Sequence, residues 1–325
     1  MKIDRLEPIN INNTRQWVLV RGNDADAPLL LHVQAGPGLP MIPEADAMER
    51  MHHLEDHFVV AYWDQRGCGK SFSKDIDPAS ISLSQLSQDV IACTESLLAR
   101  YGKRTAIVSG YSLGATVSLM SAVGRSDLFN ALFLSGIDVD IPAANVFAIE
   151  FATEKARAKG DSKLMTQLED LRNTPIVDAK RFRQRARILT DLGGIKAGST
   201  YAQLALSSVK NMLLSKSYGF GDILKTMRGM EFCQNALLNE MNSLDLFKLV
   251  DAVGVPVHFI HGRNDGIAPH DIAFEFYKHL NSPRKTFTTF EHSAHMPHYD
   301  EPEKFASLLI QQAAGDEIPA VPHRQ

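Results

Sequence analysis

A pentapeptide in the first half of the chain, Gly110-Tyr111-Ser112-Leu113-Gly114, constrains the fold more than any other segment. It lies between a β-rich run at 105–109 and a helical stretch, so it predicts a sharp turn from a strand into a helix. Such a turn leaves little room for side chains two positions from its apex, and Gly110 and Gly114 provide that room. The pattern is typical of a turn that lifts one serine hydroxyl, that of Ser112, above the edge of a sheet.

Short β-rich runs alternate with helical segments on either side of a purely helical middle stretch. The expected strands are 16–21, 29–33, 57–63, 105–109, 131–135, 255–261 and 285–290. Strands that alternate with helices indicate a mostly parallel sheet covered on both faces, which is an α/β fold. The sequence therefore predicts a core domain formed by 1–140 and 251–325, with a helical cap domain, 141–250, inserted into it. The tail at 313–325 is expected to be loose.

Composition and charge narrow the possible partners. The 325 residues are 44% hydrophobic and 22% charged, with a formal net charge of -4, which gives no electrostatic basis for binding nucleic acid. No apolar run is long enough to span a membrane, and the first residues do not resemble a signal peptide, so we expect a cytoplasmic protein. The three cysteines are too few and too scattered for a disulfide framework or a zinc site, and we expect them to be buried. No cofactor or metal is implied, and the sequence leaves the oligomeric state open.

A serine hydroxyl becomes a good nucleophile only beside a base, and that base needs a carboxylate to hold its tautomer. Asp265 follows the strand expected at 255–261, at the sheet edge where Ser112 should also lie, and is the candidate acid. Asp138, which follows the strand expected at 131–135, is the rival.

The candidate base lies after the last expected strand. The segment 291–298 holds three histidines, and His295 occupies a turn of small residues shortly before the final helix. His295 is therefore the predicted base, with His292 and His298 as alternatives. The spacing of these three histidines within a loop does not indicate a metal site.

Three motifs together resemble the proline iminopeptidase group of α/β hydrolases. They are Gln34-Ala35-Gly36-Pro37-Gly38, the run Trp63-Asp64-Gln65-Arg66-Gly67-Cys68-Gly69-Lys70-Ser71, and the Ser112 turn. The resemblance implies the α/β-hydrolase fold and a serine hydrolase mechanism. It also implies an oxyanion hole made by the backbone N–H of Gly36, which would act with that of Leu113.

Two residues of the first motif depart from the family pattern, His-Gly-Gly-Pro-Gly. Gln34 replaces the histidine and Ala35 the first glycine, and Ala35 would be strained if that position required a positive φ. In the second motif, Asp64 and Arg66 are expected to hold loops beneath the site, since a buried Asp and Arg can pair and bond backbone groups.

The resemblance also suggests a substrate. Iminopeptidases of this group bind the free amine of a peptide through acidic side chains, mostly from the cap, and Glu231 and Glu240 are the candidates here. The leading hypothesis is a serine hydrolase that acts as a proline iminopeptidase-like aminopeptidase on short peptides. An esterase, lactonase or amidase acting on a small apolar acyl compound is the alternative, and a non-catalytic binder of a small ligand is a hypothesis of another class.

Overall fold

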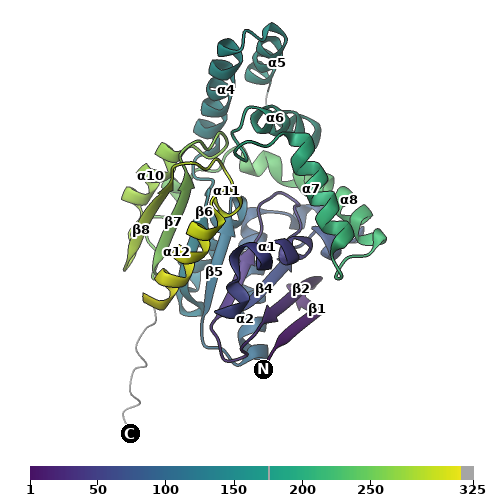
Figure 1. Cartoon of the computed structure of the whole chain (residues 1–325), viewed down its shortest axis with the longest axis vertical. Coiled ribbons are helices and arrows are strands. Elements are labelled where there is room, and N and C mark those ends of the chain that lie inside the picture. The colour runs from purple at the N-terminus through teal and green to yellow at the C-terminus, as the bar shows by residue number, and fades with distance from the viewer. Residues whose placement is uncertain (175, 316–325) are drawn as a thin grey trace.

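An eight-stranded sheet runs through the computed structural model, which describes residues 1–174 and 176–315 (Figure 1). Its spatial order is β1-β2-β4-β3-β5-β6-β7-β8. The first two neighbouring pairs, β1 with β2 and β2 with β4, are antiparallel, and all other pairs are parallel, which confirms the predicted architecture. The strands are β1 (Ile3–Ile11), β2 (Thr14–Gly22), β3 (Leu29–Val33), β4 (Val59–Asp64), β5 (Ala106–Tyr111), β6 (Phe129–Ser135), β7 (Val257–Gly262) and β8 (Lys285–Phe290).

Helices cover both faces of this sheet because successive side chains of each buried strand point to opposite faces. On β4, Ala61 and Trp63 join the hydrophobic cluster that includes α2 and α3, whereas Val60 and Tyr62 join the cluster that includes α1 and α12. The α-helices outside the run from α4 to α8 are α1 (Ala45–His52), α2 (Leu83–Tyr101), α3 (Leu113–Gly124), α9 (Leu246–Leu249), α10 (His270–His279), α11 (Pro297–Asp300) and α12 (Pro302–Gly315).

Strand β1 is not among the strands expected from the sequence. This strand forms a hairpin with β2 at the sheet edge, and several of its side chains are exposed, so it lacks a strong apolar signal. Asn12 and Asn13 make the turn with φ values of 45° and 61°. Two consecutive residues with positive φ are typical of a tight two-residue hairpin turn, and the Asn-Asn pair was the signal for it.

Only helices occur in the described part of the segment between β6 and β7 that precedes α9, as expected for a helical insertion (Figure 1). They are α4 (Ile141–Ala158), α5 (Ser162–Asn173), α6 (Ala179–Asp191), α7 (Tyr201–Leu214) and α8 (Phe220–Met241). Helices α4 to α6 share a hydrophobic cluster of their own, separate from those of the sheet. Of the tail predicted at 313–325, residues 313–315 belong to α12 and the rest lies outside the described residues.

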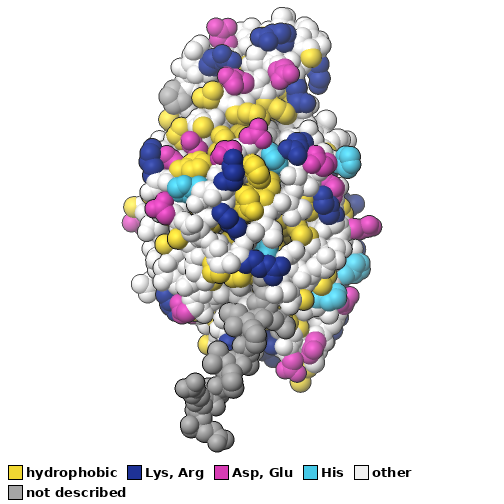
Figure 2. Space-filling model, turned by 90° about the vertical axis from the view of Figure 1, so that its left-hand side faces the viewer, with side chains coloured by type: hydrophobic (Ala, Val, Ile, Leu, Met, Phe, Trp, Pro, Cys, Tyr) yellow, Lys and Arg dark blue, Asp and Glu magenta, His cyan; other side chains and the backbone are white. Residues whose placement is uncertain are grey.

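Hydrophobic side chains gather in the upper half of the face shown in Figure 2, with Lys and Arg side chains around them. Within the residues that the structure describes, no helix is both long and apolar enough to cross a membrane.

The loop that follows β4 connects the sheet to the helical insertion. The buried Asp64 carboxylate accepts hydrogen bonds from the backbone N–H groups of Met41, Ile42 and Lys70, at 2.8, 3.0 and 2.9 Å, and from the Tyr218 hydroxyl. Lys70 adds an ion pair of 2.6 Å with Asp222 of α8. Asp64 thus joins two loops of the core to the beginning of α8.

Arg66 pairs with Asp89 of α2, and not with Asp64. Its Nε and Nη2 atoms lie 2.7 and 3.0 Å from the two Asp89 carboxylate oxygens, and both side chains are almost fully buried. Gln16 and Gln85 also donate to this carboxylate. A buried ion pair with this many hydrogen bonds fixes the loop at 64–71 against the sheet edge.

Replacing Asp89 with alanine should therefore destabilise the fold strongly, because it leaves the Arg66 guanidinium buried without its counter-charge. We expect the free energy of unfolding to fall by about 3–5 kcal/mol, measured by urea denaturation. Asp127→Asn, which breaks an exposed ion pair with Arg125, is the control and should move the urea midpoint little. Equal midpoints for both variants would contradict the structural role given to Asp89.

Candidate active site

Ser112 lies at the apex of the turn between β5 and α3, with φ 51° and ψ −124°. This is a region that non-glycine residues rarely occupy, and such strain persists where the surrounding structure enforces it. The two flanking glycines allow the turn: a Cβ on Gly110 would lie 2.6 Å from the Ala115 Cα, and one on Gly114 would overlap the carbonyl oxygens of Val33 and Gln34. The structure therefore contains the sharp strand-to-helix turn that the pentapeptide predicts.

Asp265 and His295 follow β7 and β8 and meet at the same sheet edge. The His295 Nδ1 atom lies 2.7 Å from the Asp265 Oδ2 atom. The other carboxylate oxygen accepts hydrogen bonds of 2.8 and 2.9 Å from the backbone N–H groups of Ile267 and Ala268. His261 Nε2 approaches Oδ2 to 3.4 Å. Asp265 is thus a fully partnered carboxylate that orients one ring nitrogen of His295.

The two partners shift each other's pKa. Burial opposes the charged form of Asp265, but the charge of His295 and the hydrogen bonds from His261 and His295 outweigh it and hold the pKa of that carboxyl well below its usual range. Burial likewise disfavours the His295 imidazolium, and the charge and hydrogen bond of Asp265 overcome this effect and raise the pKa of His295 above its ordinary value.

The alternative histidines are not in this position. His298 is buried, its backbone oxygen lies 2.7 Å from His52 Nε2, and burial lowers the pKa of its ring well below the ordinary value. His292 is exposed, and its backbone N–H donates to Glu301. Among the described residues, neither ring has a recorded contact with Asp265.

Asp138, the rival acid, belongs to the same cluster but contacts the serine. The Ser112 hydroxyl donates to the Asp138 Oδ2 atom at 3.2 Å, and no hydrogen bond joins Ser112 to His295 in the described structure. Burial raises the pKa of Asp138, against the opposing charge of His295. Catalytic hydrogen bonds in ligand-free enzymes are often long and close only around substrate, so this arrangement is compatible with a later Ser112–His295 contact.

A cation of the helical insertion is close enough to Asp138 for the two charges to interact. The charge of Asp138 acts on Arg185 of α6, whose Nη1 donates to Asn145 and whose Nε has no hydrogen-bond partner in the described structure. Burial lowers the pKa of the Arg185 guanidinium to about 10, against the raising effect of Asp138. Arg185 was not among the residues predicted from the sequence, because an Arg-rich amphipathic helix does not indicate which of its cations is buried.

Gly36 and Leu113, the two candidate oxyanion residues, are neighbours. A Cβ on Gly36 would lie 2.8 Å from the Leu113 Cδ2 atom. None of the hydrogen bonds among the described residues uses the backbone N–H of Gly36 or of Leu113, so both donors are available to a ligand. Ala35 does not have a positive φ, so this departure from the family motif introduces no backbone strain of that kind.

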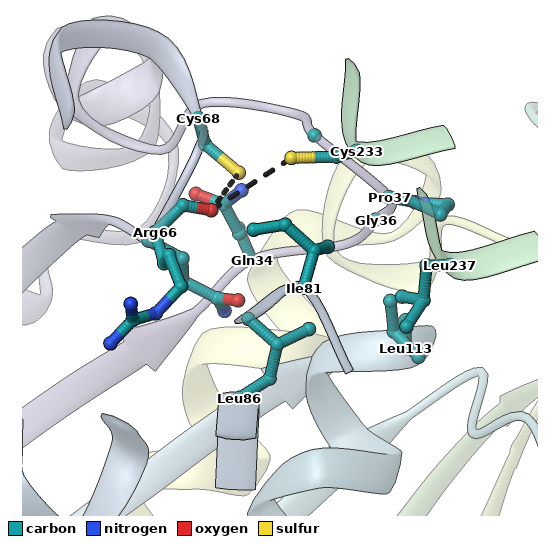
Figure 3. Close-up of a pocket in the computed structure, with 12 residues that line it drawn as sticks. Gln34, Gly36, Pro37, Arg66, Cys68, Ile81, Leu86, Leu113, Cys233 and Leu237 are labelled. Carbon is teal, nitrogen blue, oxygen red and sulfur yellow. Dashed lines mark hydrogen bonds between the residues drawn. The ribbon is translucent and has the colours of Figure 1, made fainter. Parts of the chain in front are cut away.

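A small cavity of about 10 Å³, roughly the room of one water molecule, lies behind this loop (Figure 3). Gln34, Gly36 and Leu113 line one part of it, and Cys68 and Cys233 line another. Both cysteine sulfurs point toward the Arg66 carbonyl oxygen, at 3.5 and 3.8 Å. All three cysteines are buried, which confirms that expectation, and Cys68 and Cys233 both contact the loop at 64–71, Cys233 from α8.

Glu231 and Glu240, the candidate amine-binding residues of α8, are both exposed. The Glu240 carboxylate accepts a hydrogen bond of 2.9 Å from the backbone N–H of Leu83 at the start of α2. Neither residue lines the cavity beside Gly36 and Leu113. The placement of these two carboxylates therefore gives no support to an amine-binding role.

The sheet, the Ser112 turn and the Asp265–His295 pair define an α/β hydrolase. A family model described as the alpha/beta hydrolase fold matches residues 37–302, and the chain belongs to this family.

Among individual proteins, the chain is 31% identical over 314 residues to the probable aminopeptidase YbaC of Bacillus subtilis, covering 95% of this chain and 96% of that one. A proline iminopeptidase of Mycobacterium smegmatis has a similar fold, with a TM-score of 0.68, 18% identity and coverage of 98% and 100%. An esterase from Exiguobacterium antarcticum matches with a TM-score of 0.61, 17% identity and coverage of 94% and 98%. The resemblance to iminopeptidases is thus confirmed, and at these identities the solved structures show the fold alone.

Proposed function

We propose that this α/β hydrolase is a serine aminopeptidase that removes the N-terminal residue from short peptides. The strongest support for a serine mechanism is the strained backbone of Ser112. Glycine would adopt these angles without strain, so the presence of a serine there indicates a role for its side chain. The similarity to a probable aminopeptidase along nearly the whole chain supports the choice of substrate.

In the proposed mechanism, His295 takes the proton of the Ser112 hydroxyl as that oxygen attacks the scissile carbonyl carbon. The N–H groups of Gly36 and Leu113 bind the oxygen of the tetrahedral intermediate. His295, oriented by Asp265, then gives the proton to the leaving amine, and an acyl-enzyme forms. Water, activated by His295, releases the acyl group as the free acid.

We also propose that the chain divides into two domains. The core domain is 1–140 with 251–325, and the cap domain is 141–250. The core would supply the reacting groups, which follow the parallel strands, and the cap would enclose the acyl side chain. The electrostatic interaction between Asp138 and Arg185 of α6 supports a role for the cap in the site.

An esterase is the second candidate. Glu231 and Glu240, the cap carboxylates predicted to bind a substrate amine, are exposed. Their exposure favours a substrate that has no amine.

Cleavage of a substrate panel separates these functions. The panel holds proline p-nitroanilide, other aminoacyl p-nitroanilides and short-chain p-nitrophenyl esters, with Ser112→Ala as the control. We expect Ser112-dependent cleavage of aminoacyl anilides. Cleavage of the esters alone would replace the aminopeptidase with an esterase, and cleavage that persists in Ser112→Ala would refute the serine mechanism.

A further inference from the structure

The Asp138 carboxylate is in an unusual position for a group outside the Asp265–His295 pair. It lies on the loop after β6, its side chain is buried, and its one recorded hydrogen bond comes from the Ser112 hydroxyl. Thr116 fixes the loop by donating to the Asp138 backbone oxygen at 2.8 Å. The carboxylate is therefore held beside the candidate nucleophile by the fold.

This carboxylate has unused capacity to accept hydrogen bonds. Asp265 accepts bonds from two backbone N–H groups and from His295, whereas the described structure records a single donor for Asp138. An ionised carboxylate accepts up to about four, and buried polar groups are normally satisfied. The charge of Asp138 acts on Arg185, but the described structure records no ion pair between them. Neither Asp138 oxygen is among the fully buried unpartnered atoms of the described structure, so the carboxylate remains open to a donor from a ligand.

The geometry of an aminoacyl group identifies that donor. In an aminoacyl substrate, the amine nitrogen lies about 2.5 Å from the carbonyl carbon, because only the Cα separates them. A carbonyl carbon poised for attack lies about 3–3.5 Å from the serine oxygen. The amine is then within about 6 Å of Ser112 Oγ. Asp138 Oδ2 lies 3.2 Å from the same Oγ, so the amine comes within hydrogen-bonding reach of Oδ2 when it lies on the Asp138 side of the serine.

We infer that Asp138 binds the free α-amine of the substrate through a charge-assisted hydrogen bond. This inference rests on the proposed aminopeptidase function and assigns to a core residue the role expected of the cap residues Glu231 and Glu240. The arriving ammonium group takes over Asp138 Oδ2, which releases the Ser112 hydroxyl to donate to His295.

The test is the full-length Asp138→Asn variant, which keeps the size of the side chain and removes its charge. We expect kcat/KM for proline p-nitroanilide, relative to that for p-nitrophenyl butanoate, to fall by about 100-fold. The matched control is Glu154→Gln, which makes the same change of carboxylate to amide at an exposed residue of α4. It should keep the wild-type ratio. An equal loss on both substrates would overturn the inference, because it would make Asp138 a positioning residue for Ser112. The inference would also be overturned if the ratio of the two kcat/KM values fell in Glu231→Gln or Glu240→Gln but stayed at the wild-type value in Asp138→Asn.

Inhibition by pyrrolidine provides a second readout that needs no peptide cleavage. Pyrrolidine is a cation at neutral pH and carries the proline amine without a carbonyl. It should inhibit hydrolysis of p-nitrophenyl butanoate by the wild type and inhibit the Asp138→Asn enzyme, or Asp138→Ser if the asparagine variant misfolds, at least tenfold more weakly. Wild-type enzyme that is inhibited but cleaves no aminoacyl anilide would refute the aminopeptidase and leave the amine site standing. Equal inhibition of wild type and variant would refute the amine site alone.

Discussion

Ser112→Ala is expected to lower kcat/KM by about five to six orders of magnitude on any substrate that the wild type cleaves, as in serine hydrolases that lose their nucleophile. The reason is that no other described hydroxyl lies at the apex of the β5–α3 turn, beside the unused N–H groups of Gly36 and Leu113. Initial rates on the best substrate of the panel provide the measurement.

Ser112→Gly is the informative companion variant. Glycine adopts φ 51° and ψ −124° without strain, so this variant should be equally inactive but more stable than the wild type by about 1–3 kcal/mol in urea denaturation. A glycine variant less stable than the wild type would mean that the serine is kept for structure, and would count against the proposed nucleophile.

Asp265→Asn should have the second-largest effect, a fall in kcat of about four orders of magnitude. The amide that replaces the carboxylate cannot stabilise the imidazolium that forms as Ser112 loses its proton, and it permits the wrong tautomer of His295. Asp271→Asn, close by in the sequence but with an exposed carboxylate, is the matched control and should keep wild-type activity.

The pH profile tests the same pair. The base acts in its neutral form, so activity rises as the pH passes through the pKa of His295. Because Asp265 raises that pKa, the wild-type profile of kcat/KM should have its midpoint above the ordinary histidine value of 6.5. In Asp265→Asn the midpoint should move to lower pH, since burial then acts on His295 without the compensating charge. A midpoint that is the same in both enzymes would exclude His295 as the group that titrates.

Much of the candidate site could be predicted because each part carries a local signal. The Gly-x-Ser-x-Gly pattern requires small flanking residues, and Asp265 and His295 follow strands that are clear in the sequence. Parallel strands bring such residues to one edge of the sheet, whatever their separation along the chain.

The features that could not be predicted depend on long-range contacts, which leave no local pattern in the sequence. Arg66 pairs with Asp89 of α2 and not with its sequence neighbour Asp64, and no periodicity indicates that choice. Strand β1 has too little buried surface to produce a strand signal, and the direction in which Arg185 points is decided by how α6 packs. The contact between Asp138 and Ser112 follows from the side-chain conformation that each adopts in the packed site.

The hydrogen bonds of Asp64 and the Lys70–Asp222 ion pair have a consequence for how substrate enters. They attach the beginning of α8 to the sheet, and a Cβ on Gly38 would lie only 2.6 Å from the Met230 Cα, so α8 packs directly on the oxyanion loop. Helices α4 and α5, in contrast, project away from the sheet (Figure 1). In the proposed aminopeptidase, any movement that admits substrate would thus involve helices α4 to α6, while α8 keeps the candidate oxyanion loop in place.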